Sequence, residues 1–268
     1  MSSHTPVFEI NKLSKVFYAR GSLFRHASTV IAVALDQVTM QVNRGEILGL
    51  AGESGSGKST LAEILVDLQT PTEGEVLYQG KILSSMGHHE RRNFRSRVQM
   101  IFQDPYESLN PRHTVLRTVS EALVNSGINS RVEIISRVKE SLEQVGLQPT
   151  SAFLETYPHQ LSGGQRQRVS IARAIVIRPD VLIADEPVSM LDVSLRAGIL
   201  KLLRDIRERM ELTILYISHD ISTMSYLCDQ IAILYGGQLK ELGPIRQVLI
   251  SPQDSYTKKL LAALPSLS

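Results

Sequence analysis

A glycine-rich segment near the start of the chain places the strongest constraint on its fold. Residues 52–59 read Gly-Glu-Ser-Gly-Ser-Gly-Lys-Ser and match the phosphate-loop pattern G-x-x-x-x-G-K-[ST]. The apolar run 47–51 leads into this loop as a buried strand would. Apolar residues follow it at helical spacing: Leu61, Ile64, Leu65 and Leu68. Strand, loop and helix together aim backbone N–H groups and a positive helix end at a phosphate, which predicts binding of a nucleoside triphosphate.

The residue types in this loop suit that task. The predicted nucleotide contacts are Gly52, Ser54, Gly55, Gly57, Lys58, Ser59 and Thr60. The glycines let the backbone close around the phosphates, in part at positive φ. Lys58 is predicted to contact the β- and γ-phosphates, and Ser59 to offer its hydroxyl to Mg²⁺. Thr60 either begins the helix or touches a phosphate oxygen, and the two interpretations are equally good.

Composition excludes several other classes of protein. The net charge of +2 is too small to indicate nucleic acid as the main partner. Cys228 is the only cysteine, so this chain alone cannot form a disulfide or an iron–sulfur cluster, and a reducing cytosol is its expected setting. No stretch reaches about 18 uninterrupted apolar residues, and residues 1–6 are polar, so we expect neither a membrane span nor a signal core. Association with a membrane would then require another polypeptide.

The order of apolar segments predicts an α/β fold. Short β-type segments are expected at 7–10, 13–18, 30–34 and 38–42, with a polar, basic loop at 19–28. Later strands are expected at 74–80, 98–102, 181–184, 213–217 and 231–235. Residues 88–97 are expected to form a basic, polar helix or loop, and the pattern from about 112 to 158 predicts helix. Strands that alternate with helices predict a parallel sheet covered on both faces.

Two finer features are predicted in the second half. One helix face carries Leu195, Ile199, Leu202, Leu203, Ile206 and Met210. The pair Gly236-Gly237 marks a hairpin after the last of these strands.

A pair of carboxylates ends one of the predicted strands. Residues 181–186 read Val-Leu-Ile-Ala-Asp-Glu. Because an unpaired buried charge is costly, such a pair indicates a function. Asp185 is predicted to hold Mg²⁺, directly or through water. Glu186 would then face the γ-phosphate and polarise the attacking water.

A second glycine pair suggests another anion site. Residues 161–168 read Leu-Ser-Gly-Gly-Gln-Arg-Gln-Arg, and a helical pattern follows. A chain with two phosphate sites and one expected nucleotide suggests that the second site serves a neighbouring subunit. The alternative is a helix cap with a basic first turn, and this segment alone does not decide between them.

Taken in order, these motifs resemble the nucleotide-binding subunit of an ATP-binding-cassette (ABC) transporter over nearly the whole chain. Residues 52–60 resemble the Walker A motif, 181–186 the Walker B motif and 161–165 the LSGGQ signature. The resemblance implies a P-loop NTPase core with a mostly parallel sheet, an N-terminal antiparallel β-subdomain and an inserted α-helical subdomain. ATP and Mg²⁺ are the implied cofactors, and ATP hydrolysis is the implied reaction.

Three further residues match the family's single-residue motifs. Gln103 resembles the Q-loop glutamine, Asp192 the D-loop aspartate and His219 the switch histidine. The resemblance implies that Gln103 senses Mg²⁺ and the γ-phosphate. It implies that His219 contacts the γ-phosphate and holds the attacking water together with Glu186. Asp192 would touch the partner's site.

The resemblance assigns further nucleotide contacts. The signature residues that would complete the partner's ATP pocket are Ser162, Gly163, Gly164 and Gln165. The family usually stacks adenine on an aromatic side chain of the N-terminal sheet. Phe17 has the best-matching spacing for this role, and its neighbour Tyr18 is the alternative. Either ring could instead pack within the sheet.

The resemblance also implies a division of a single ABC ATPase domain, residues 1–268. The nucleotide-binding core with its β-subdomain would comprise 1–110 and 173–240, and the helical signature subdomain 111–172. Residues 241–268 would form a C-terminal extension.

Two segments narrow the branch of the family. Residues 102–112 resemble the long Q-loop of peptide- and nickel-importer ATPases, and the tail 256–265 is similar to that branch's C-terminal extension. The resemblance implies an importer whose cargo is di- or oligopeptides, with nickel or another small solute as the second candidate cargo. It implies a second, different ATPase subunit in a head-to-tail dimer, two permease subunits and an external binding protein. The chain would lie on the cytoplasmic face of the plasma (inner) membrane.

Two departures and two alternatives remain. The chain lacks the cysteines that many members of this branch use for an iron–sulfur cluster, and Met190 stands in the D-loop where a small residue is common. A soluble cassette ATPase acting on nucleic acid or ribosomes is the main alternative. Such proteins usually carry two cassettes, long coiled coils or strongly basic stretches, which this sequence lacks. A P-loop kinase would leave the signature segment and His219 unexplained.

Overall fold

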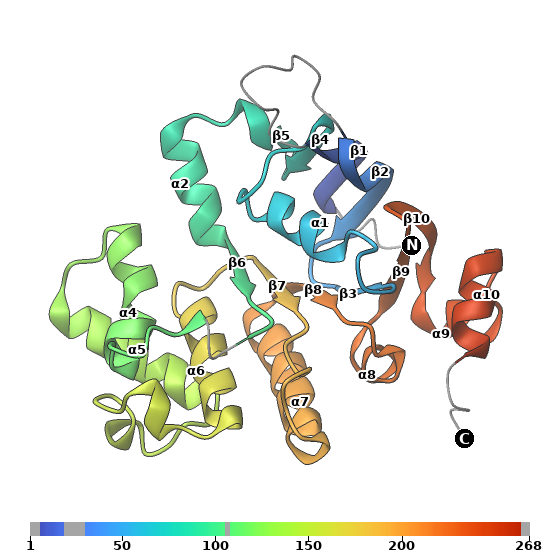
Figure 1. The fold of residues 1–268 in the computed structure, drawn as a ribbon. Helices are drawn as coiled ribbons and strands as arrows, with labels where there is room; N and C mark the ends of the chain where they lie inside the picture. The colour runs from blue at the N-terminus through green and yellow to red at the C-terminus, as the bar shows by residue number, and fades with distance from the viewer. Residues whose placement is uncertain (1–5, 19–29, 105–107, 264–268) are drawn as a thin grey trace. The chain divides into compact units, whose positions relative to one another are not determined.

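The computed structural model describes residues 6–18, 30–104 and 108–263 (Figure 1). The chain forms two compact units, residues 1–87 with 215–268 and residues 88–214, which are described separately below. The loop predicted at 19–28, part of the 102–112 segment and the last residues of the predicted tail lie outside the described residues.

The first unit contains an antiparallel sheet in the order β2-β1-β4-β5. Its strands are β1 (Pro6–Tyr18), β2 (Val30–Asn43), β4 (Glu73–Tyr78) and β5 (Lys81–Ile82). The prediction of four short strands before residue 45 is wrong, because β1 and β2 each run through the predicted break. Lys12 and Gln37 adopt φ of 45° and 49° at those breaks, where the β1–β2 register shifts. These β-bulges interrupt the alternation of side chains without ending the strand.

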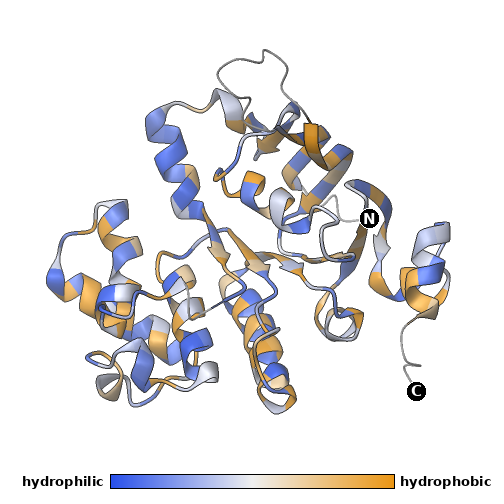
Figure 2. Cartoon of the chain, in the orientation of Figure 1, coloured by the Kyte–Doolittle hydropathy of each residue, from blue (hydrophilic) through white to orange (hydrophobic). Residues whose placement is uncertain are grey.

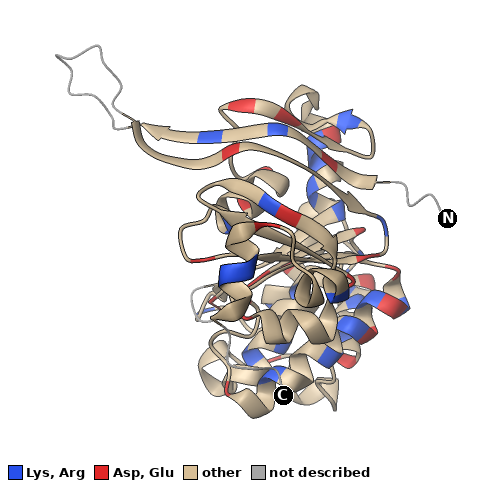
Figure 3. Ribbon diagram, turned by 90° about the vertical axis from the view of Figure 1, so that its right-hand side faces the viewer, with Lys and Arg blue, Asp and Glu red and all other residues tan. Residues whose placement is uncertain are grey.

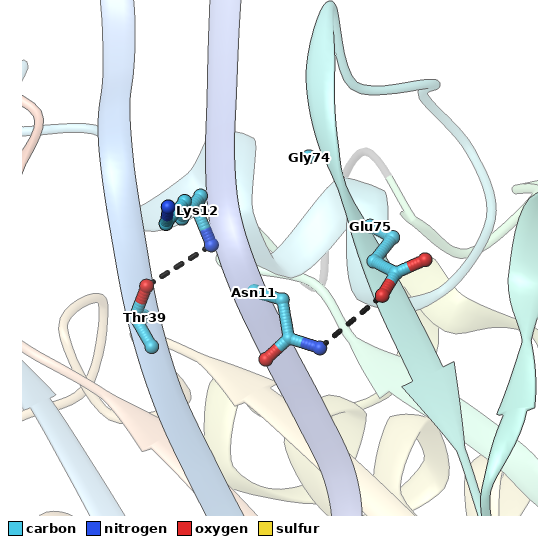
Figure 4. Close-up of a pocket in the computed structure, with 5 residues that line it drawn as sticks. All are labelled: Asn11, Lys12, Thr39, Gly74 and Glu75. Atoms are coloured by element: carbon cyan, nitrogen blue, oxygen red, sulfur yellow. Dashed lines mark hydrogen bonds between the residues drawn. The ribbon is translucent and has the colours of Figure 1, made fainter.

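The bulge in β1 keeps its hydrogen bonds through neighbouring strands. The Lys12 backbone N–H donates to the Thr39 hydroxyl at 3.0 Å, and the Asn11 amide donates to the Glu75 carboxylate at 3.4 Å (Figure 4). The Thr39 side chain thus satisfies a backbone N–H at the bulge, and the bond between the Asn11 and Glu75 side chains joins β1 to β4.

The same unit holds strands that surround the phosphate loop, in the order β10-β9-β3-β8. They are β3 (Ile47–Ala51), β8 (Thr213–Ile217), β9 (Gln230–Tyr235) and β10 (Gln238–Pro244). β3 and β9 are parallel, and β10 folds back antiparallel on β9. The hairpin predicted at Gly236-Gly237 is confirmed, with both residues at positive φ. Every residue of β3 is buried, which agrees with its uninterrupted apolar sequence.

The α-helices among the described residues of this unit are α1 (Lys58–Leu65), α8 (Ile221–Leu227), α9 (Ile245–Ile250) and α10 (Ser255–Ala262). α1 buries Leu61, Ile64 and Leu65 as predicted. The placement of Leu68 on the same face is wrong, because the helix ends at Leu65 and Asp67 turns the chain with φ of 61°. Leu68 is 61 % exposed as a result.

The second unit contains the parallel pair β6 (Val98–Ile101) and β7 (Val181–Asp185). Its α-helices include α2 (His88–Arg97), α4 (Val115–Ser126), α5 (Arg131–Gln144), α6 (Gly163–Ile175) and α7 (Val193–Met210). Residues 112–158, all of them described, contain helices and turns but no strand, as predicted. The α/β prediction, with an antiparallel N-terminal sheet and further strands that pair mostly in parallel, is confirmed.

The apolar face predicted for α7 is correct only in part. Ile199, Leu202, Leu203 and Ile206 are buried, but Leu195 is 43 % exposed. The first turns of the helix carry mainly exposed residues, so its buried face begins at Ile199. Figure 2 shows hydrophobic and hydrophilic residues mixed along this helix. In Figure 3, basic and acidic residues are interspersed along the ribbon that faces the viewer.

Cys228 packs beneath the phosphate-loop strand. A Cβ placed on Gly49 of β3 would lie only 3.0 Å from its sulfur, and the thiol is buried. Burial, and secondarily the charge of Asp229, raise the pKa of the Cys228 thiol far above its usual range.

A buried neutral thiol is a poor nucleophile, because alkylation requires the thiolate. We expect iodoacetamide at pH 8 to modify Cys228 at least about tenfold more slowly in the folded protein than in urea, as read by intact mass. Glutathione, with its free thiol, serves as the reagent control. Equal rates in both states would contradict the buried placement.

Candidate nucleotide-binding and hydrolysis site

The phosphate loop needs glycine at two positions for steric reasons. Gly52 adopts φ of 154°, and a Cβ there would lie 2.2 Å from the Leu234 carbonyl oxygen. Gly57 adopts φ of 104°, and a Cβ there would lie 2.2 Å from the Ala34 carbonyl oxygen. At 2.2 Å a Cβ atom would overlap the carbonyl oxygen at each position, so no residue with a side chain fits there. The backbone of the loop therefore packs directly against β9 and β2.

Lys58 lies inside this loop. Its side chain is buried, and its ammonium donates to the carbonyl oxygens of Gly52 and Glu53, each at 2.8 Å. The loop therefore concentrates positive charge where the sequence predicts β- and γ-phosphates.

The start of α1 also suits an anion. Its N-cap, Gly57, provides no side-chain hydrogen bond, and its first turn contains no acidic residue. The N–H groups of that turn and the helix dipole therefore face the loop uncapped by any side chain. Ser59 is exposed and Thr60 half-buried in this turn, while Ser54 and Gly55 lie exposed on the loop.

His219 lies on a segment that is hydrogen-bonded to the phosphate-loop strand. The Ser218 backbone N–H donates to the Leu50 carbonyl at 3.3 Å, two residues before Gly52. The Ser218 hydroxyl accepts from the Asp220 N–H at 3.0 Å, which shapes the turn that presents the exposed His219. Sequence reasoning missed the part played by Ser218, and nothing but its place before His219 could have indicated it.

The second unit brings Gln103 and Glu186 together. The Gln103 amide donates to the Glu186 carboxylate at 3.0 Å. Asp185 ends β7 and is buried, whereas Glu186 is half-buried and adopts φ of 45°. The Glu186 carbonyl accepts from the Ser189 N–H and hydroxyl, which stabilises this unusual conformation. Such backbone strain often occurs at functional sites, and here it coincides with the contact between Glu186 and Gln103.

The signature segment forms a capping box at the start of α6. The Ser162 hydroxyl accepts from the Gln165 backbone N–H at 3.3 Å, and the side-chain amide oxygen of Gln165, Oε1, accepts from the Ser162 backbone N–H at 2.9 Å. The helix-cap interpretation is therefore realised within this chain. Gly163 and Gly164 occupy the first turn without side chains that would block an approaching phosphate.

Asp192 occupies the N-cap position of α7 but makes no capping hydrogen bond with its side chain. It is exposed, and its apolar neighbours Met190 and Val193 are 57 % and 79 % exposed. This arrangement leaves the carboxylate of Asp192 on the surface.

Phe17 and Tyr18 lie at the end of β1. Phe17 is half-buried, and the Lys15 ammonium lies 5.2 Å from its ring centroid while it donates to the Thr70 carbonyl. Tyr18 is 49 % exposed. The cation holds one side of the Phe17 ring, and the choice between the two rings as adenine contact stays a prediction.

Comparison with known protein families shows to which family this chain belongs. The ABC transporter model matches residues 35–189, more than half of the chain and both the phosphate loop and the carboxylate pair. The chain belongs to the ABC transporter family. As an ABC ATPase it binds ATP and Mg²⁺ and hydrolyses ATP.

Individual relatives of this ABC ATPase match along almost its whole length. The dipeptide transport ATP-binding protein DppF of Haemophilus influenzae is 40 % identical over 268 residues, which cover 100 % of this chain and 81 % of that protein. The oligopeptide transport ATP-binding protein AppF of Bacillus subtilis is 39 % identical over 97 % of this chain and 78 % of its own length.

A solved structure of an ABC cassette shares the fold. The dimeric, post-hydrolysis cassette MJ0796 bound to ADP and Pi has a TM-score of 0.76 and 30 % identity, covering 89 % of this chain and 99 % of that one. Within the described part of the ABC ATPase, no helix is both long and apolar enough to cross a membrane.

Proposed function

We propose that this chain is the ATP-hydrolysing subunit of a membrane importer for peptides. The observation that carries the proposal is the near-complete alignment, at about 40 % identity, with ATP-binding proteins named for dipeptide and oligopeptide transport. The segment that resembles the long Q-loop supports the same branch. Nickel or another small solute is the second candidate cargo.

The residues of the phosphate loop bind the substrate in this proposal. Lys58 contacts the β- and γ-phosphates of ATP, and the start of α1 supplies N–H donors. Ser59, Gln103 and Asp185 would hold Mg²⁺, since hydroxyl, amide and carboxylate oxygens are the ligands that this ion prefers. When bound, Mg²⁺ neutralises phosphate charge as the terminal phosphoryl group leaves.

We assign hydrolysis to two residues that follow strands: Glu186 after β7 and His219 after β8. Glu186 accepts a proton from the attacking water, and its hydrogen bond from Gln103 fixes the orientation of the carboxylate. His219 contacts the γ-phosphate. Phe17 stacks on adenine, with the Lys15 ammonium on its ring.

A second ATPase subunit completes the site. The residues that act on the partner's nucleotide are Ser162, Gly163, Gly164, Gln165 and Asp192. MJ0796 was solved as a dimer, which supports this arrangement for a related cassette. We propose a different chain as partner, in a head-to-tail dimer against two permease subunits at the cytoplasmic face of the plasma (inner) membrane, with an external binding protein that delivers the cargo.

Division into subdomains follows from the same proposal. The core comprises 1–110 and 173–240, the helical signature subdomain 111–172 and the C-terminal extension 241–268. ATP binding biases a two-state element, and the segment from about 103 to 115 together with the helical subdomain passes the movement to the permease.

Uptake in cells tests the proposed cargo. A strain that expresses Glu186→Gln in place of the native protein is expected to take up labelled dipeptides or oligopeptides at less than about a tenth of the native rate, because hydrolysis drives the cycle. Glu208→Gln, an exposed residue of α7, is the matched control and should keep native uptake.

Each cargo gives a distinct outcome in this experiment. Loss of peptide uptake alone supports the proposal, and loss of Ni²⁺ uptake alone replaces peptides with nickel. Unchanged uptake of both peptides and Ni²⁺ would contradict an importer of this branch. Co-purification of nucleic acid or ribosomes with the native protein would then favour a soluble cassette ATPase that acts on them.

A further inference from the structure

The back of the phosphate loop rests on the hairpin between β9 and β10. The Leu234 carbonyl lies against Gly52, and the Gly237 N–H donates to the Ser56 carbonyl at 3.2 Å. Tyr235 stands between these two contacts. A movement of Tyr235 would therefore displace both points at which the hairpin touches the loop.

The C-terminal helix α10 is fixed to the same hairpin. The Glu241 carboxylate of β10 accepts from the N–H groups of Gln253 at 2.8 Å and Asp254 at 3.1 Å. Asp254 in turn caps the helix by accepting from the N–H groups of Tyr256 and Thr257. Thr257 is fully buried. These contacts set the position of the side chains in the first turn of α10.

Tyr256 reaches from α10 to the loop. Its ring stacks on Tyr235 with centroids 4.0 Å apart and planes at 24°. The oxygen of its hydroxyl is inaccessible to solvent and meets no described partner at standard hydrogen-bond geometry. Burial, and then the charge of Glu53 in the phosphate loop, raise the pKa of the Tyr256 hydroxyl to about 12, so the hydroxyl stays protonated at neutral pH.

Glu53 lies in the same loop as the phosphate-binding lysine. Its backbone carbonyl accepts from the Lys58 ammonium at 2.8 Å, and it also accepts from the Ser56 N–H at 3.2 Å. A shift of this loop would therefore move the lysine and the turn that follows it. Tyr256 supports the loop from behind, through its stack on Tyr235 beside the contacts to Gly52 and Ser56.

We propose that Tyr256 of the C-terminal helix is a positioning residue for the phosphate loop, which it holds in its phosphate-binding form through its stack on Tyr235. The inference rests on the proposed role of this loop in binding ATP. It gives the C-terminal helix a task in nucleotide affinity, beyond any contact it makes with other subunits.

Nucleotides of different length test this role. The phosphate loop contacts the β- and γ-phosphates, so a misplaced loop weakens ATP and ADP but leaves AMP unaffected. We expect Tyr256→Ala to raise the Kd of ATP and ADP about tenfold, whereas Tyr256→Phe, which keeps the ring stack, should stay within about twofold of native. The kcat at saturating ATP should change less than about twofold, because the lost interaction is uniform binding.

The measurement is displacement of a fluorescent nucleotide from the full-length protein by ATP, ADP and AMP, together with steady-state kinetics. Lys258→Ala, an exposed neighbour on α10, is the matched control and should bind all three nucleotides as the native protein does.

The outcomes separate a positioning role from a structural one. Equal weakening of AMP, or ATP and ADP affinities within about twofold of native in Tyr256→Ala, would overturn the inference. Weakening by Tyr256→Phe as large as that by Tyr256→Ala would also overturn it, because the ring stack would then not be the interaction that acts. If Tyr256→Ala does not fold, Tyr256→Leu, which removes the ring with less loss of volume, decides by the same criterion. A native protein that fails to bind ATP would instead overturn the proposed function of the loop.

Discussion

Replacing Glu186 with glutamine is expected to leave ATP bound while hydrolysis slows at least about a hundredfold, since a positioned general base typically contributes 10²–10⁴-fold. The substitution is almost isosteric. The amide oxygen of the new side chain can still accept the hydrogen bond that Gln103 donates at 3.0 Å. Position is therefore preserved and only the basicity of the group is lost, so the expected loss, about 3 kcal/mol or more of barrier, reports on proton transfer.

Two readouts are needed for this variant. Phosphate release gives kcat, and equilibrium binding gives the Kd of ATP, which should stay within about threefold of native because binding depends on the loop. Glu208→Gln changes the charge equally on an exposed face of α7 and should leave both values unchanged. A kcat within tenfold of native in Glu186→Gln would remove this residue from the role of general base.

The sequence predicts well those parts of the fold whose conformation is set by residues close together in the chain. β3, the phosphate loop and the start of α1 lie within 19 consecutive residues, 47–65, and each residue type there has one dominant requirement. The hairpin at Gly236-Gly237 is of the same kind. In these segments pattern, turn chemistry and packing agree.

Predictions failed where the structure depends on pairing between strands that are distant in the chain or on the point at which a helix ends. The bulges at Lys12 and Gln37 depend on the pairing of β1 with β2, which local alternation cannot reveal. Leu68 and Leu195 fit a helical repeat, yet both are exposed because the buried face stops short of them. Periodicity identifies a helix face but not the point at which its neighbours end.

The candidate site divides in the same way. Gln103 and Glu186 lie 83 residues apart in the chain, and no local pattern predicts their hydrogen bond. The carboxylate pair at a strand end indicated Glu186 and the family resemblance indicated Gln103, and the structure adds the contact between them. Neither a local pattern nor the family resemblance indicated the stack of Tyr256 on Tyr235, because this contact depends on where the C-terminal helix packs.

Replacing Lys58 with alanine is expected to weaken ATP binding about a hundredfold, or about 2.7 kcal/mol, and to abolish measurable turnover. Hydrogen bonds to a charged group typically contribute 1.5–3 kcal/mol, and the lysine ammonium would meet two phosphates in a buried loop. Its removal also leaves the carbonyl oxygens of Gly52 and Glu53 without the donor that they now share. Lys58→Arg is not expected to restore affinity, because a planar guanidinium does not fit a site shaped for a compact ammonium.

Thermal unfolding with and without ATP measures this loss independently of turnover. At ATP equal to about 100 times the native Kd, binding stabilises the native protein by about 2.7 kcal/mol, but a variant with hundredfold weaker binding gains only about 0.4 kcal/mol. Lys201→Ala, an exposed lysine of α7, should keep the full ATP-dependent shift. A Kd within threefold of native in Lys58→Ala would mean that the loop holds phosphate through its backbone alone. In that case the buried lysine would serve to close the loop through Gly52 and Glu53, with no direct part in binding.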